Sequence, residues 1–102
     1  MQIKKGVILN GLNIKMRKVL TNANQVWGLH GKELCVTAGL DGAHSAGSLH
    51  YYGLAVDLRT RYFSGEVKKQ IVGELQRALG DKYDVVAHRT HIHCEYDPKE
   101  VI

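Results

Sequence analysis

The sequence of 102 residues has one proline, only two cysteines, and no apolar run that approaches the roughly 20 residues of a membrane-spanning helix. Cys35 and Cys94 form no C-x-x-C pair and no zinc-ligand spacing, so we expect two buried, reduced thiols. The apolar stretch near the N-terminus is too short for a signal peptide. These absences predict a protein that is made in the cytoplasm without a signal peptide and has no membrane partner.

The composition is that of a globular protein. Hydrophobic residues make up 44% and charged residues 24%, which excludes a disordered, collagen-like or coiled-coil chain, and the length fits a single domain over residues 1–102. The net charge of +4 is small, and the basic residues are scattered with little aromatic interleaving. We therefore expect no nucleic-acid partner. A small nucleic-acid-binding domain remains a hypothesis of lower rank, and it predicts salt-sensitive binding to DNA or RNA.

Apolar periodicity and turn residues divide the chain into two helices and four strands. In order, we predict a helix over residues 11–28, strands over 34–38 and 53–59, a helix over 64–79, and a hairpin of strands over 83–87 and 90–96. We expect Asn10 or Asn13 to cap the first helix and Ser64 the second, with a loop over residues 39–49. The pattern predicts an α+β fold with a small antiparallel-rich sheet backed by helices.

Histidine is unusually frequent, with six in the chain, of which we expect His30 to face solvent. His50 precedes a predicted strand that carries Asp57, and pleating places His91 and His93 on one face of a later strand. If the strands share a sheet surface, two imidazoles and a carboxylate converge. Such a set suits zinc, and three protein ligands leave a fourth position for the water of a catalytic site. Each residue alone has a simpler structural interpretation, but the whole set favours one zinc ion per chain.

The segment over residues 48–57 resembles the S-x-H-x-x-G-x-A-x-D signature of the zinc D-alanyl-D-alanine carboxypeptidase family. The matching positions are Ser48, His50, Gly53, Ala55 and Asp57. Relatives of this family include D-Ala-D-Ala dipeptidases, bacteriophage L-alanyl-D-glutamate endolysins and the hedgehog signalling domain. The downstream His91-x-His93 is similar to the H-x-H of several branches. The resemblance covers roughly residues 36–97 and implies a hedgehog/DD-peptidase-like fold.

The resemblance also implies roles for individual residues. His50, Asp57 and His93 match the three zinc ligands, and His91 matches the catalytic histidine beside the metal. Many members have a catalytic glutamate three residues before the last zinc histidine, where this chain has Thr90, so the general base stays open, with His91 ranked first. Second candidates for supporting the metal, moving protons or binding substrate are Ser48, His44, His88, Glu95 and Arg59.

The function that the resemblance implies is hydrolysis of peptide bonds in bacterial peptidoglycan. The protein would be a zinc metallopeptidase that cuts stem peptides or cross-links, either as a D,D-carboxypeptidase or as an endopeptidase. The small size suggests a phage or prophage enzyme that reaches the cell wall by holin-type release or as part of a virion, and we expect a monomer. The alternative is a non-catalytic zinc-binding module, similar to the hedgehog relatives, that binds the cell wall or a protein.

Overall fold

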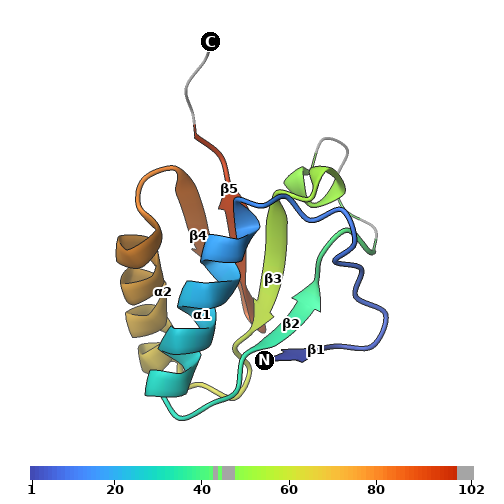
Figure 1. The fold of residues 1–102 in the computed structure, drawn as a ribbon. Coiled ribbons are helices and arrows are strands. Elements are labelled where there is room, and N and C mark those ends of the chain that lie inside the picture. Colours follow the sequence, from blue (N-terminus) through green and yellow to red (C-terminus); the bar gives the residue numbers. More distant parts are fainter. Residues whose placement is uncertain (43, 45–47, 99–102) are drawn as a thin grey trace.

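The computed structural model describes residues 1–42, 44 and 48–98, and these residues form two α-helices, one 3₁₀ helix and five strands (Figure 1). In chain order the elements are β1 (Gln2–Ile3), α1 (Met16–Leu29), β2 (Cys35–Ala38), η1 (Leu49–Tyr52), β3 (Ala55–Arg59), α2 (Gly65–Leu79), β4 (Tyr83–Ala87) and β5 (His91–Tyr96). Within the loop predicted over residues 39–49, positions 43 and 45–47 lie outside the described residues.

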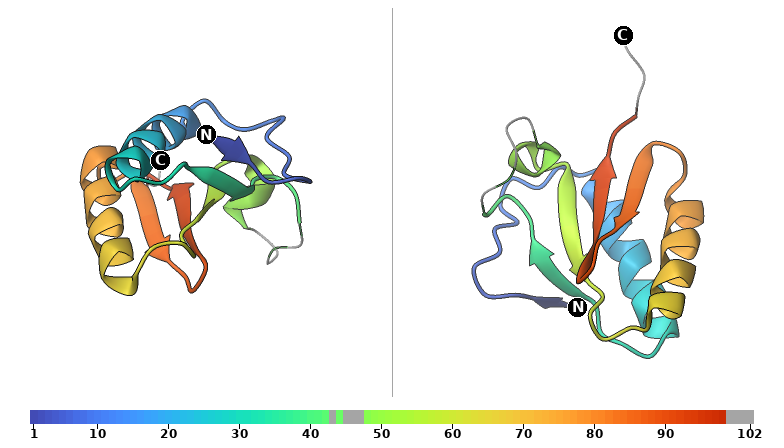
Figure 2. Two further views of the ribbon diagram at one scale, coloured as in Figure 1. Left: turned by 90° about the horizontal axis from the view of Figure 1, so that it is seen from below. Right: turned by 180° about the vertical axis from the view of Figure 1, so that it is seen from behind.

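The strands form one mixed sheet in the order β1-β2-β3-β5-β4. The pair of β1 and β2 is parallel, and the other three pairs are antiparallel. Both α-helices lie on one side of this sheet, which leaves the other face without an α-helix (Figure 2). The predicted α+β class, with an antiparallel-rich sheet backed by helices, is therefore confirmed.

The core lies between the helices and the sheet. Strand pleating sends Val56, Leu58, Ile92 and Cys94 toward the helices, where all four are fully buried. Trp27 of α1 is also fully buried, and its indole N–H donates to the backbone carbonyl of Arg59 at 2.9 Å. Because the alternate residues of β3 and β5 point the other way, their polar side chains gather on the face that carries no helix.

Helix α2 begins and ends as the sequence predicts. The Oγ of Ser64 accepts a hydrogen bond from the backbone N–H of Val67, and Gly80 ends the helix with a φ of +90°. Helix α1, in contrast, begins at Met16 rather than residue 11. Asn13 does accept a hydrogen bond from the backbone N–H of Lys15, but this bond closes a turn before the helix and does not cap it.

Two elements escape the sequence pattern. Strand β1 has only two residues, which is too short for any periodic signal. The 3₁₀ helix η1 lies within the segment between the predicted strands, and Gly53 ends it with a φ of +69°. A Cβ atom at Gly53 would lie 2.4 Å from the carbonyl oxygen of Gly11, so glycine is required both for the backbone angle and for the close approach of the N-terminal segment.

Two smaller expectations have different outcomes. Cys35 and Cys94 are buried free thiols as predicted, and burial raises the pKa of the Cys94 thiol. His30 does not point freely into solvent, because its Nε2 lies 2.7 Å from a carboxylate oxygen of Glu74 on α2. Across the described residues, each helix falls short of the length and apolar character needed to cross a bilayer.

Candidate metal centre

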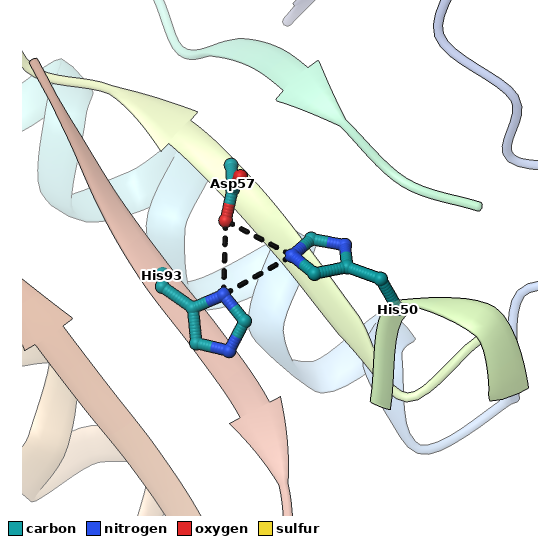
Figure 3. A group of neighbouring side chains, drawn as sticks. All are labelled: His50, Asp57 and His93. Carbon is teal, nitrogen blue, oxygen red and sulfur yellow. Dashed lines mark hydrogen bonds and ion pairs between the residues drawn. The ribbon is translucent and has the colours of Figure 1, made fainter. Parts of the chain in front are cut away.

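Three elements bring His50, Asp57 and His93 together on the open face of the sheet. Asp57 in β3 is paired directly with His93 in β5, so their side chains emerge side by side from adjacent strands. His50 lies in η1, which the Oγ of Ser48 caps by accepting the backbone N–H of His50. Figure 3 shows the three side chains pointing toward one another.

The three facing atoms form a nearly equilateral triangle. Nε2 of His50 lies 3.2 Å from Oδ1 of Asp57 and 3.1 Å from Nδ1 of His93, and the last two atoms are 3.0 Å apart. A tetrahedral zinc ion with bonds of about 2.0–2.1 Å separates its ligand atoms by about 3.3–3.4 Å. The triangle therefore needs to widen by only a few tenths of an ångström to fit such an ion. These residues constitute a candidate metal-binding group.

The protonation of His50 is determined by a backbone contact. Its Nδ1 lies 2.8 Å from the carbonyl oxygen of Gly39, and because a carbonyl oxygen only accepts, Nδ1 must carry the proton. In the neutral ring this leaves Nε2 as a bare lone pair directed at the triangle. A second hydrogen bond that orients a ring and selects its tautomer in this way is typical of histidines that bind metals.

His93 is held in the opposite tautomer by a carboxylate. Its Nε2 donates to Oε1 of Glu95 at 2.8 Å, so that Nδ1 of the neutral ring is the bare atom. The triangle then consists of two imidazole lone pairs and one carboxylate oxygen, all acceptors, at mutual distances of hydrogen-bond length. Three acceptors are stable so close together only around a shared proton or a cation.

The electrostatics of the group follow from the same contacts. Burial alone would raise the pKa of Asp57, but the facing nitrogens of His50 and His93, when they carry a proton, donate hydrogen bonds to its carboxylate. These bonds outweigh burial and hold the pKa of Asp57 well below its ordinary value. The hydrogen bond with Asp57 raises the pKa of His93, burial opposes this rise, and the bond to Glu95 adds to it. The carboxyl group therefore remains charged throughout the neutral range, which is the state that a metal ion requires.

The remaining two predicted histidines lie beside this triangle. Nε2 of His91 is 3.8 Å from Oδ2 of Asp57, and the His91 ring stacks on that of His88 with centroids 4.9 Å apart. Burial lowers the pKa of His91, with His88 and His93 acting in the same direction against Asp57. His91 is therefore adjacent to the triangle without being one of its corners.

A hollow of about 700 Å³, here called the triad hollow, opens on the triangle. Its lining contains nearly all the residues singled out in the sequence: His44, Ser48, Leu49, His50, Asp57, His88, His91, His93, Glu95 and Asp97. His44 stacks on His50 with ring centroids 4.0 Å apart, and its Nε2 donates to the carbonyl oxygen of Asp41. His44 thus packs against the ring of His50 and is not one of the three corners of the triangle. Arg59 does not line the triad hollow and borders a separate one.

Two supporting contacts lie beyond what the sequence analysis assigned. The sequence offers Glu95 as a candidate base, yet its carboxylate accepts a hydrogen bond from the ring of His93. The sequence signal for this contact is the position of Glu95 two residues beyond His93 on the same strand face. The carbonyl of Gly39 has no signature in the sequence, because every residue carries one. A further group of carboxylates, Asp84, Glu95 and Asp97, is close enough to share an ion but contains no imidazole.

Comparison with known proteins adds no assignment. No protein-family model matches the sequence, and no curated protein matches it significantly. The geometry of the site and the sequence motif are therefore the observations that indicate its chemistry.

Proposed function

We propose that the protein is a zinc-dependent metallopeptidase that hydrolyses peptide bonds in bacterial peptidoglycan stem peptides or cross-links. The observation that carries the proposal is the convergence of Nε2 of His50, Oδ1 of Asp57 and Nδ1 of His93 within 3.0–3.2 Å of one another. Both rings present their unprotonated nitrogens, because Gly39 and Glu95 engage the other ones. Two neutral imidazoles and one carboxylate are a ligand set found in catalytic zinc sites.

The surroundings of the triangle favour a catalytic role for the metal. Structural zinc sites are closed by four protein ligands, whereas this group has three and borders the triad hollow. His50 is buried at 3% exposure, but the side chain of His91 on the hollow side is 31% exposed. A substrate entering the hollow would therefore meet the metal position and His91 together.

The roles of the chain's own residues follow from their contacts. When bound, a zinc ion supplies Lewis-acid polarisation and activation of water. Glu95 and the Gly39 carbonyl orient the ligand rings, and Ser48 holds the turn that carries His50. His91, which is not a corner of the triangle, stabilises or transfers charge at the reacting group.

The substrate class rests on the sequence motif. The pattern from Ser48 to Asp57 with the downstream His91-x-His93 resembles that of zinc peptidases that act on cell-wall stem peptides, and the α+β fold is compatible with a hedgehog/DD-peptidase-like assignment. A phage or prophage origin, action at the cell wall and a monomeric state belong to the same proposal. The triad hollow is large enough for a few residues of peptide.

The proposal is tested by metal analysis followed by an assay. The purified protein should contain one zinc ion per chain and should release products from peptidoglycan or from stem peptides ending in D-Ala-D-Ala, with the cut bond identified by mass spectrometry. Activity should disappear with a chelator and return with zinc, and Asp57→Asn should show neither metal nor cleavage. Cleavage that persists in excess chelator would contradict the zinc mechanism. Stoichiometric zinc without any cleavage would favour the non-catalytic module.

A further inference from the structure

A second hollow of about 300 Å³, here called the basic hollow, lies next to the triad hollow. Three cationic side chains line it: Lys4, which follows β1, Arg59 at the end of β3, and Arg61 just beyond it. The two hollows share Asp57 and His91 in their linings, so His91 stands between them. Any ligand that spans both must pass this ring.

The basic hollow carries a net positive charge, because three cations and one carboxylate line it. Lys4, Arg59 and Arg61 form no ion pair with a carboxylate in the part of the chain that the structure describes. The one carboxylate in the lining, Asp57, is already engaged by His50 and His93. Three like charges around one concavity produce a positive potential that concentrates anions.

The backbone that carries these side chains is firmly held. The carbonyl of Arg59 accepts the indole N–H of Trp27, and the N–H of Thr60 donates to the carbonyl of Thr90 at 3.0 Å. The N–H of Lys4 donates to the carbonyl of Val36 at 2.9 Å. The cations therefore project from fixed strand ends, and an arginine fork so placed suits a planar carboxylate, which it can bind through two parallel hydrogen bonds.

The position of Arg59 relates the basic hollow to the candidate metal centre. Arg59 lies two residues after Asp57 on the same face of β3 and is paired directly with His91 across the sheet. Two residues of a strand span about 6.5–7 Å, and an extended peptide covers the same length in two residues. A peptide whose reacting bond lies at the triangle would therefore bring a group one or two residues away into the basic hollow.

We propose that the basic hollow binds a carboxylate of the peptide substrate, located one or two residues from the bond that is cut, with Arg59 as its principal partner. The inference rests on the proposed peptidase function and names the feature of the substrate that the site selects. Lys4 and Arg61 add positive charge around the same carboxylate, and Thr37 and Thr90 complete the polar lining of the hollow.

The kinetic test uses pairs of stem peptides that differ only in one carboxylate near the cut bond, which is replaced by a carboxamide. With the unmodified protein, amidation at the recognised position should lower kcat/KM by about 10-fold to 100-fold, as expected for loss of a charged hydrogen bond. Arg59→Gln should lower kcat/KM for the acidic peptide by a similar factor and abolish the difference between acid and amide. Zinc content should not change. Arg17→Gln, which removes an exposed arginine from α1, should behave as the unmodified protein.

A binding test separates this inference from the proposed function. N-acetylglutamate is titrated into protein freed of metal by chelation and dialysis, and the backbone amide signals of Thr37 and Thr90 are followed by NMR. Saturable shifts that vanish in the Arg59→Gln/Arg61→Gln double variant would support the subsite even if no peptide were cleaved. An unchanged preference for the acidic peptide in Arg59→Gln, with zinc-dependent cleavage intact, would overturn the subsite while leaving the peptidase assignment in place.

Discussion

Four of the histidines that line the triad hollow form two pairs that differ in what holds their rings. His50 and His93 each have one ring nitrogen engaged by a protein acceptor, the Gly39 carbonyl and the Glu95 carboxylate, and their other nitrogens face Asp57. We call these two the inner pair. The outer pair, His88 and His91, stack on each other, and His91 approaches Asp57 only to 3.8 Å.

The difference separates binding from proton transfer. A metal ligand must present one fixed lone pair, which requires an oriented ring and a defined tautomer, as in the inner pair. A ring that stabilises or moves charge must instead remain accessible, and the His91 side chain, 31% exposed at the edge of the triad hollow, meets this requirement. The proposed function therefore gives His91 and His93, two residues apart, different roles according to the contacts of their rings.

The largest expected effect is loss of metal from the triangle of His50, Asp57 and His93. His50→Ala, Asp57→Ala and His93→Ala each remove one of three ligands, so each variant should lose stoichiometric zinc after dialysis, as measured by elemental analysis. The loss of zinc affinity should be larger than the loss of about 10-fold to 100-fold that is typical when a residue that only orients a ligand is substituted. His30→Ala is the matched control, because His30 pairs with Glu74 away from the site, and it should retain zinc. Retention of zinc by all three ligand variants would contradict the assignment of these residues as metal ligands.

Substitution in the outer pair should affect rate and not metal. His91→Ala should retain one zinc ion per chain and lower kcat by about 100-fold to 10,000-fold, the usual contribution of a group that transfers a proton. Elemental analysis and the peptide assay on the same preparation test both parts. If His91→Ala lost metal to the same extent as the three ligand variants, His91 would itself be a metal ligand. The distinction between the inner and outer pairs would then be wrong.

The sequence predicts the face of a side chain better than its exact partner. Period-2 alternation correctly places His91 and His93 on one face of β5 with Ile92 in the core, because pleating depends only on local backbone geometry. That β3 brings Asp57 to the same sheet surface is a condition in the sequence interpretation, and the structure meets it. It does not reveal that Asp57 pairs with His93 and that His91 instead pairs with Arg59, since the register arises from contacts distant in sequence.

The N-terminal region was predicted least well for a related reason. Strand β1 has two residues, and its parallel pairing with β2 depends on a partner more than 30 positions away, as in the bond from the N–H of Gln2 to the carbonyl of Leu34. The predicted start of α1 is too early because Asn13 closes a turn instead of capping the helix. Backbone carbonyls such as that of Gly39 can be assigned a role only once the fold is known.

A smaller effect is expected from the group that orients His93. Glu95→Gln keeps an oxygen that can accept the Nε2 proton but removes the charge, so zinc affinity should fall by about 10-fold. Competition with a chelator of known affinity measures the change. Asp97→Asn is the control, because it removes a charge from the lining of the same hollow without altering a hydrogen bond to either ligand ring. Equal losses in both variants would indicate a general charge effect rather than orientation of the ring.

The smallest effect should come from Asp41, which acts on the inner pair only indirectly, through the backbone of Gly39. Its Oδ1 accepts the backbone N–H groups of Ile8 and Gly39, both at 2.9 Å, and so holds the residue whose carbonyl orients His50. Burial opposes the shift, but the hydrogen bonds from Ile8 and Gly39 lower the pKa of Asp41 below its ordinary value of 3.8. A lowered pKa means that the folded state favours the charged form. This stabilisation is complete above the ordinary pKa and is lost as the pH falls through the lower folded-state value.

Asp41→Asn should therefore reduce the free energy of unfolding by at most about 1 kcal/mol at pH 7, because the residue is only half-buried and solvent screens its charge. The difference between variant and unmodified protein should shrink as the pH falls below 3.8, since protonation then removes the same charge from Asp41. Urea unfolding at pH 7 and near pH 3 measures both values, and taking the difference cancels the other acidic groups. A difference that stayed constant across this range would show that Asp41 acts through its shape and not its charge, and that the support of His50 does not depend on ionisation of this loop.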